Sequence, residues 1–165
     1  MKNAVAAIVV GLCGGIFCLS SCTKEKQDID YTSYVNPLIG TGGHGHTFPG
    51  AVVPHGMIQP SPDTRIDGWD ACSGYYYADS TINGFSHTHV SGTGCADYGD
   101  FLLMPTVGQQ LYDPQDYSSQ TLPYASPFSH ENEVATPGYY SVFLDRYQVK
   151  AELTATQRAA LHRYT

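Results

Sequence analysis

Basic residues are scarce in this chain of 165 residues. Lysine and arginine total 8 against 15 aspartates and glutamates, so the formal net charge is -7 at pH 7. A protein that binds nucleic acid neutralises phosphates with a patch of lysine and arginine, and this composition does not supply one. We therefore expect no nucleic-acid partner.

Helical patterns are also missing. The sequence contains no useful length of apolar residues at the helical period, no internal repeat and no coiled-coil heptads. Short strand-like runs instead follow one another about every ten residues, joined by turn-rich segments. The sequence predicts an all-β fold, an antiparallel β-sandwich. The expected strands are residues 30–36, 82–90, 101–107, 138–144, 147–155 and 158–165, with a hairpin turn at Asp145 and Arg146.

The N-terminus has the pattern of a targeting segment. Lys2 supplies a positive charge, and the apolar run at residues 4–18 is too short to span a bilayer comfortably. Residues 19–22 (LSSC) resemble the bacterial lipoprotein box, in which the cysteine is acylated. Acyl chains contribute on the order of 0.8 kcal/mol per buried CH₂, enough to hold a multiply acylated protein on a membrane. An ordinary secretory peptide cut nearby is the alternative.

This assignment divides the chain into three parts. We expect residues 1–22 to be a lipoprotein signal segment with Cys22 lipidated, residues 23–30 to be a charged tether, and residues 31–165 to form the domain. The protein would then sit in the bacterial cell envelope, lipid-anchored at a periplasmic or outer-membrane surface.

Two cysteines remain after the signal segment, Cys72 and Cys95. In an oxidising compartment they can pair, but the sequence does not supply the geometry that a disulfide needs. Two separate thiols are the other possibility. The CxxC and CxxH patterns of structural zinc sites are missing.

Glycine and histidine gather in two stretches, residues 38–60 and 82–101, which we expect to form the walls of one site. On a strand, His87 and His89 would point to the same face. The first hypothesis for the site is therefore a zinc centre that adds His44 or His46 and a carboxylate. The carboxylate would be Asp97 or Asp100.

Two further hypotheses use the acidic and aromatic residues. Inverting hydrolysis of a glycosidic bond needs two carboxyl groups roughly 6.5–9.5 Å apart. Candidates are Asp63, Asp67, Asp70, Asp97 and Asp100. Alternatively the site only binds sugar, with Trp69, the single tryptophan, stacking on a sugar ring. A serine triad lacks its nucleophile elbow, because residues 91–94 (SGTG) are not G-x-S-x-G.

Several motifs, in order along the chain, resemble the N-terminal domain of glycoside hydrolase family 92, the calcium-dependent α-mannosidases. They are residues 34–41 (YVNPLIGT), 49–51 (PGA), 54–57 (PHGM), 84–94 (GFSHTHVSGTG) and 97–100 (DYGD), followed by 151–156 (AELTAT), Arg158 and residues 162–164 (HRY). The resemblance covers roughly residues 31–165.

The resemblance implies a two-domain exo-acting enzyme in which the β-sandwich packs on an (α/α)6 barrel and α-linked mannose is removed with inversion. The catalytic carboxylates and most calcium ligands would belong to the barrel. By motif match, Phe48, Trp69, Asp70 and Cys72 would line the mannose pocket, with His87, His89, Asp97 and Asp100 as possible support. No catalytic residue or metal ligand is expected in this chain.

The end of the chain also carries an expectation. Residues 158–165 read as a strand in mid-course, which would leave an unpaired edge. We therefore expect a β-sandwich that is incomplete at its C-terminus, lacks its barrel partner and is inactive alone. Its partners would be the barrel, α-mannosides of glycans and, through the lipid anchor, a membrane. A stand-alone, non-catalytic carbohydrate-binding lipoprotein is the alternative.

Overall fold

The computed structural model describes residues 29–96, 98–109 and 121–165. The chain forms two units, Met1–Asp30 and Tyr31–Thr165, and the fold below is that of the second. The expected signal segment, Cys22 and most of the tether lie outside the described residues. Within the described part of the chain, no helix is long and apolar enough to cross a membrane.

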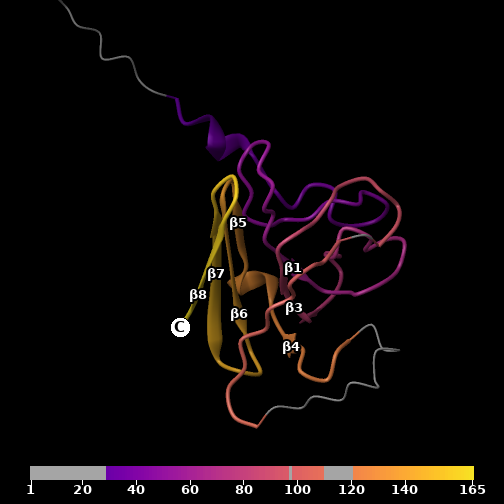
Figure 1. Cartoon of the computed structure of the whole chain (residues 1–165), viewed down its shortest axis with the longest axis vertical. Coiled ribbons are helices and arrows are strands. Elements are labelled where there is room, and N and C mark those ends of the chain that lie inside the picture. Colours follow the sequence, from indigo (N-terminus) through magenta and orange to yellow (C-terminus); the bar gives the residue numbers. More distant parts are fainter. Residues whose placement is uncertain (1–28, 97, 110–120) are drawn as a thin grey trace, which may run out of the picture. The chain divides into compact units, whose positions relative to one another are not determined.

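A four-stranded antiparallel meander forms the largest sheet, with strand order β5-β6-β7-β8 (Figure 1). Its strands are β5 (Val134–Thr136), β6 (Tyr139–Leu144), β7 (Val149–Ala155) and β8 (Ala160–Tyr164). Tyr140 lies opposite Leu153 and Val142 opposite Ala151, so β6 and β7 pair along their length. The expected hairpin and the expected C-terminal strand are both confirmed.

Two short strand pairs complete the described sheets. β1 (Ser61–Asp63) pairs with β3 (Gly84–Ser86), and β2 (Thr81–Ile82) pairs with β4 (Ser126–Pro127), both antiparallel. The described helical turns are of the 3-10 type, η2 (Tyr31–Tyr34) and η3 (His130–Asn132). The prediction of an all-β antiparallel fold is therefore confirmed.

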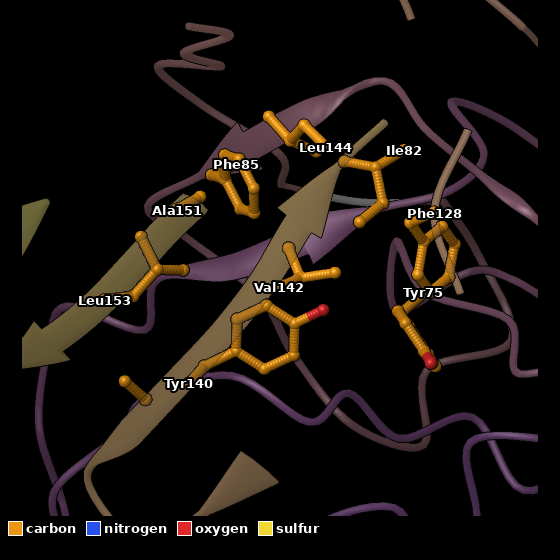
Figure 2. Close-up of a cluster of buried hydrophobic side chains, with 10 residues drawn as sticks. Tyr75, Ile82, Phe85, Phe128, Tyr140, Val142, Leu144, Ala151 and Leu153 are labelled. Carbon is orange, nitrogen blue, oxygen red and sulfur yellow. The ribbon is translucent and has the colours of Figure 1, made fainter. Parts of the chain in front are cut away.

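The core lies between the inner face of the large sheet and the segments that carry β2, β3 and β4. Tyr140, Val142 and Leu144 alternate along β6 and are fully buried. They meet Ile82 and Phe85 across the core, where Figure 2 shows the side chains pointing toward one another. Each such side chain contributes about 1.5–3 kcal/mol when it leaves water. This two-layer packing of antiparallel strands is the expected β-sandwich.

Two expected strands do not form, and the expected strand at residues 82–90 is reduced to β2 and β3. Residues 30–36 hold the 3-10 turn η2, whose residues are all exposed, so the segment does not bury one face as a core strand would. Residues 101–107 form only an isolated bridge, Phe85 with Leu103. Phe101 has a φ of 57° and is 81% exposed, which ends an extended segment, and Pro105 removes a backbone donor.

The outer face of the large sheet carries an ion-pair network around Glu152. Both carboxylate oxygens accept from Arg163, with Nε and Nη2 each at 2.7 Å, and Oε1 also accepts from the Tyr139 hydroxyl at 2.7 Å. The hydrogen bonds from Arg163 and then Tyr139 lower the pKa of Glu152 to about 2. Since the carboxyl group is more acidic in the folded chain, its contribution to stability is present above its unfolded pKa and is lost as pH falls toward about 2.

Replacing Glu152 with glutamine is therefore expected to make the stability of the fold less dependent on pH in the acidic range. Thermal unfolding of both chains would be followed by circular dichroism at about pH 6 and about pH 2.5, on either side of the ordinary glutamate pKa. Between these two pH values, the melting temperature should fall further in the wild type than in Glu152→Gln. Glu131→Gln, at an exposed position, is the matched control and should behave as wild type. Equal losses in wild type and Glu152→Gln would contradict the assignment.

Candidate functional site

A buried histidine–aspartate pair lies at the centre of the candidate site. His89 Nε2 is 3.0 Å from Asp63 Oδ1 and 3.0 Å from Ser86 Oγ, and its Nδ1 donates to the Gln59 carbonyl at 2.7 Å. Burial acts to lower the pKa of His89, but the charge of Asp63 and the hydrogen bonds to Asp63 and Gln59 outweigh it, so the pKa is raised. The pair therefore forms a buried, hydrogen-bonded link between β1 and the segment after β3.

This constellation is not a serine nucleophile site. In a catalytic triad the serine and the aspartate contact opposite nitrogens of the histidine ring. Here Ser86 and Asp63 both lie at Nε2, and the Nδ1 is held by a backbone carbonyl. Ser86 is also fully buried. The geometry agrees with the missing nucleophile elbow, and the role of the three residues is structural.

The expectation that His87 and His89 share one face of a strand is wrong, because β3 ends at Ser86, before both of them. His87 Nδ1 lies 2.9 Å from the Phe101 carbonyl, and its ring stacks on His162 at 4.8 Å. His89 faces Asp63 instead. The two imidazoles have separate partners, so they do not form the zinc centre hypothesised from their spacing.

A cleft of about 120 Å³ opens beside the buried pair. Its lining includes Cys72, Asp63, Arg65, His89 and Tyr98. Cys72 is buried, whereas Cys95 is exposed, and both are free thiols. Of the two possibilities for the cysteines, the structure therefore has separate thiols.

The exposed part of the site is built around Trp69, whose side chain is 55% exposed. The His44 and His46 rings lie against its indole, with ring centroids 4.9 and 4.3 Å away. Asp70 Oδ1 lies 2.6 Å from His44 Nδ1. An apolar ring face and a carboxylate are thus presented side by side, a combination that suits a sugar's C–H face and hydroxyl groups.

The two glycine- and histidine-rich stretches are adjacent, as expected. The Gly92 backbone N–H donates to the His46 carbonyl at 2.8 Å, and the Ser73 hydroxyl donates to the same carbonyl at 2.8 Å. A Cβ at Gly94 would lie only 3.0 Å from Trp69 Nε1, so the second stretch packs closely against the indole. These contacts fix the loops around the site.

The remaining predicted site residues are dispersed. Phe48 is half-buried, packs against the core, and its ring lies 5.0 Å from that of His89. Asp100 accepts from the Thr88 hydroxyl at 3.0 Å, and Asp97 lies outside the described residues. Of the four residues matched to the mannose pocket, Cys72 lines the cleft, while Trp69 and Asp70 lie with the two histidines.

The calcium implied by the resemblance does not fit the residues that the structure brings together. Calcium takes six to eight oxygen ligands. In the described part of the chain, His44, His46 and Asp70 are close enough to share an ion, but they offer two nitrogens and one carboxylate. These three residues therefore do not supply a calcium site.

The Asp63–His89 pair was missed at the sequence level. The two residues are 26 positions apart, and no motif joins them. Their proximity follows from the register of β1 on β3, in which Asp63 lies opposite Gly84 and Ser61 opposite Ser86. Only a correct pairing of two three-residue strands would have revealed it.

An exposed aromatic ring beside a carboxylate suits a protein that acts on carbohydrate, and comparison with known proteins agrees. Residues 34–165 match the Glycosyl hydrolase family 92 N-terminal domain. A family 92 α-mannosidase from Bacteroides thetaiotaomicron, solved in complex with mannoimidazole, is 48% identical with a TM-score of 0.75; the match covers 81% of this chain and 18% of that one.

Two further relatives are more distant. A family 92 inverting mannosidase from Bacteroides thetaiotaomicron VPI-5482 is 35% identical with a TM-score of 0.69, over 85% of this chain and 18% of that one. An uncharacterized secreted glycosidase from Arthroderma benhamiae is 35% identical over 88% of this chain and 19% of its own length. The chain belongs to glycosyl hydrolase family 92, within its N-terminal domain, and spans less than a fifth of the length of these relatives.

Proposed function

We propose that this chain is the N-terminal, substrate-pocket-contributing domain of an inverting exo-α-mannosidase that acts on mannose-containing glycans. The proposal is supported by the family membership and by two of the similar structures, which are mannosidases. The catalytic carboxylates and most of the calcium ligands would come from an (α/α)6 barrel outside this chain. By itself the domain would not hydrolyse mannosides.

The observation that carries the proposal is the open, one-sided form of the site. Ligand pockets have volumes of roughly 300–1,000 Å³, whereas the cleft beside Cys72 measures about 120 Å³. Trp69 and the Asp70 side chain remain exposed, at 55% and 38%. Such a surface supplies one wall of a sugar pocket and needs a second wall to enclose the ligand.

The proposed wall of the sugar pocket consists of Trp69, Asp70, Cys72 and Phe48, and each residue has a distinct role. The Trp69 indole would pack on the apolar face of mannose, and the Asp70 carboxylate would accept hydrogen bonds from sugar hydroxyls. Cys72 would close the wall next to the cleft, and Phe48 would support it from the core side through its contact with His89. Lipidation of Cys22 would place this wall at the bacterial cell envelope.

Replacing Trp69 with alanine in the full-length enzyme tests this wall. Losing about 100 Å² of apolar contact costs about 2.5 kcal/mol at about 25 cal/mol per Å², so kcat/KM for an α-mannoside, with calcium present, should fall roughly 60-fold. Tyr34→Ala removes another exposed aromatic side chain and is the matched control, expected to keep wild-type kcat/KM. The isolated chain serves as the blank.

Three results would count against the proposal. An unchanged kcat/KM in Trp69→Ala would mean that the surface around Trp69 does not line the mannose pocket. Turnover of an α-mannoside by the isolated chain above a mock preparation would show that the chemistry does not need the barrel. A reading frame that stops at Thr165 would favour the alternative, a stand-alone carbohydrate-binding lipoprotein.

A further inference from the structure

Three metal-ligating side chains converge on the loop surface next to Trp69. His44, His46 and Asp70 each offer one ligand atom, and these atoms all lie within 4.8 Å of one another. His44 Nδ1 and Asp70 Oδ1 are already 2.6 Å apart. Small adjustments of the exposed His44 and the partly exposed Asp70 side chains around His46 would bring all three atoms to the distances of about 2.0–2.2 Å that a bound zinc ion requires.

One of these side chains is buried without its hydrogen bonds being satisfied. His46 is only 9% exposed, and its Nε2 has no hydrogen-bond partner. An unpaired buried polar group costs about 1–3 kcal/mol. No polar group of the described residues therefore bonds this imidazole nitrogen, as expected when the nitrogen binds an external ligand.

The backbone that carries the two histidines is fixed independently of any ion. A Cβ at Gly45 would lie 2.1 Å from the Gly40 carbonyl oxygen, so only glycine fits between the histidines. His46 itself has a φ of 52° and is anchored through its carbonyl by Ser73 and Gly92. A loop held in this way presents its side chains with little ordering to be done on binding.

The donor set selects the kind of ion. Two imidazole nitrogens and one carboxylate are the ligands of zinc and neighbouring divalent transition metals, with a fourth position open to water or a ligand. Calcium and magnesium prefer oxygen ligands. The Trp69 indole packs against both imidazoles and helps to orient them.

We infer that His44, His46 and Asp70 form a binding site for a divalent transition-metal ion of the zinc class. The site is separate in ligand chemistry from the calcium of the family. It shares Asp70 with the proposed sugar surface, but it does not rest on the proposed function, because metal binding by this chain is measured without any mannoside.

The single tryptophan makes the site directly measurable. Because Trp69 lies within 5 Å of both imidazole rings, titration of the chain with Co²⁺, a quenching substitute for Zn²⁺, should reduce its fluorescence and saturate at one equivalent. Added Zn²⁺ should restore the fluorescence by displacing Co²⁺, and Ca²⁺ should not.

Variants at the exposed ligands give the decisive comparison. His44→Gln and Asp70→Asn should each weaken the apparent affinity at least 10-fold, since even partners outside the coordination sphere change metal affinity by about 10–100-fold. His55→Asn is the matched control: His55 is exposed with a φ of 58°, a conformation that asparagine tolerates, and the affinity should not change. Circular dichroism would verify that each variant keeps the wild-type spectrum.

Two outcomes would overturn the site. One is the absence of saturable quenching in the folded wild type. The other is the same Co²⁺ affinity in wild type, His44→Gln and Asp70→Asn, which would assign the quenching to ions bound elsewhere.

Discussion

Replacing Asp63 with alanine is expected to lower the free energy of unfolding by about 3–5 kcal/mol, the usual cost of leaving a buried charge without its partner. The Asp63 carboxylate contacts His89 Nε2 and also accepts from the buried Ser86 backbone N–H at 2.9 Å. Asp63→Asn should cost less, because an amide oxygen still accepts from Ser86. Urea unfolding followed by circular dichroism measures both.

The pH dependence of stability provides a second signature. The pKa of His89 is raised in the folded wild type, so the stability that this histidine contributes is fully present below its unfolded pKa of about 6.5 and is lost as pH rises through the folded pKa. Without the Asp63 charge, burial would lower the pKa of His89 instead. Protonation would then favour unfolding, so both Asp63 variants should lose stability on acidification through about pH 6.5.

Asp67→Asn is the matched control, because Asp67 is exposed in the loop that follows β1. It should change the unfolding free energy by less than about 0.5 kcal/mol and leave the pH dependence as in wild type. If the Asp63 variants showed the wild-type pH dependence, His89 would not be the group that carries it.

The sequence predicts the regular half of this fold well. Along β6, Tyr140, Val142 and Leu144 alternate with less buried residues, and β7 repeats the pattern after a four-residue turn, residues 145–148. Alternation of this kind is a local signal, and a hairpin needs no distant partner. The run at residues 101–107 looks just as apolar, yet Phe101 is 81% exposed, and among the described residues the segment's pairing is a single bridge between Leu103 and Phe85.

The arrangement of the candidate site was predicted less well than the strands of the large sheet. The sequence identified the correct residue types, two histidine pairs and several aspartates, but combined them wrongly. His44 and His46 lie beside Asp70 rather than with His87 and His89, and His89 faces Asp63. These combinations depend on how loops are folded and on the register of β1 with β3, which are properties of distant contacts and not of local spacing.

Glu133 is the second position where a large effect is expected. Its side chain is only 1% exposed and accepts from the Tyr75 hydroxyl at 3.0 Å and the Tyr140 hydroxyl at 2.7 Å. His130 Nδ1 lies 2.6 Å from the same carboxylate. Burial and the charge of Glu133 raise the pKa of both tyrosines, so both hydroxyls remain donors to the carboxylate.

Glu133→Ala would leave two buried hydroxyls unpaired, at about 1–3 kcal/mol each. We expect it to lower the unfolding free energy by about 4 kcal/mol, measured by urea unfolding. Glu133→Gln keeps an acceptor and should lose roughly half of that. Glu131→Ala, at an exposed position two residues away, is the control and should stay within about 0.5 kcal/mol of wild type.

A double-mutant cycle separates the lost hydrogen bond from the lost volume. Tyr140→Phe removes the hydroxyl that Glu133→Ala would leave unpaired, so the double variant should be more stable than the sum of the two single changes predicts, by about 1–3 kcal/mol. Additive losses would mean that the Tyr140 hydroxyl finds another partner when the carboxylate is gone. Glu133 would then be a space-filling residue, and the hydrogen-bond network would not be what connects η3 to the core.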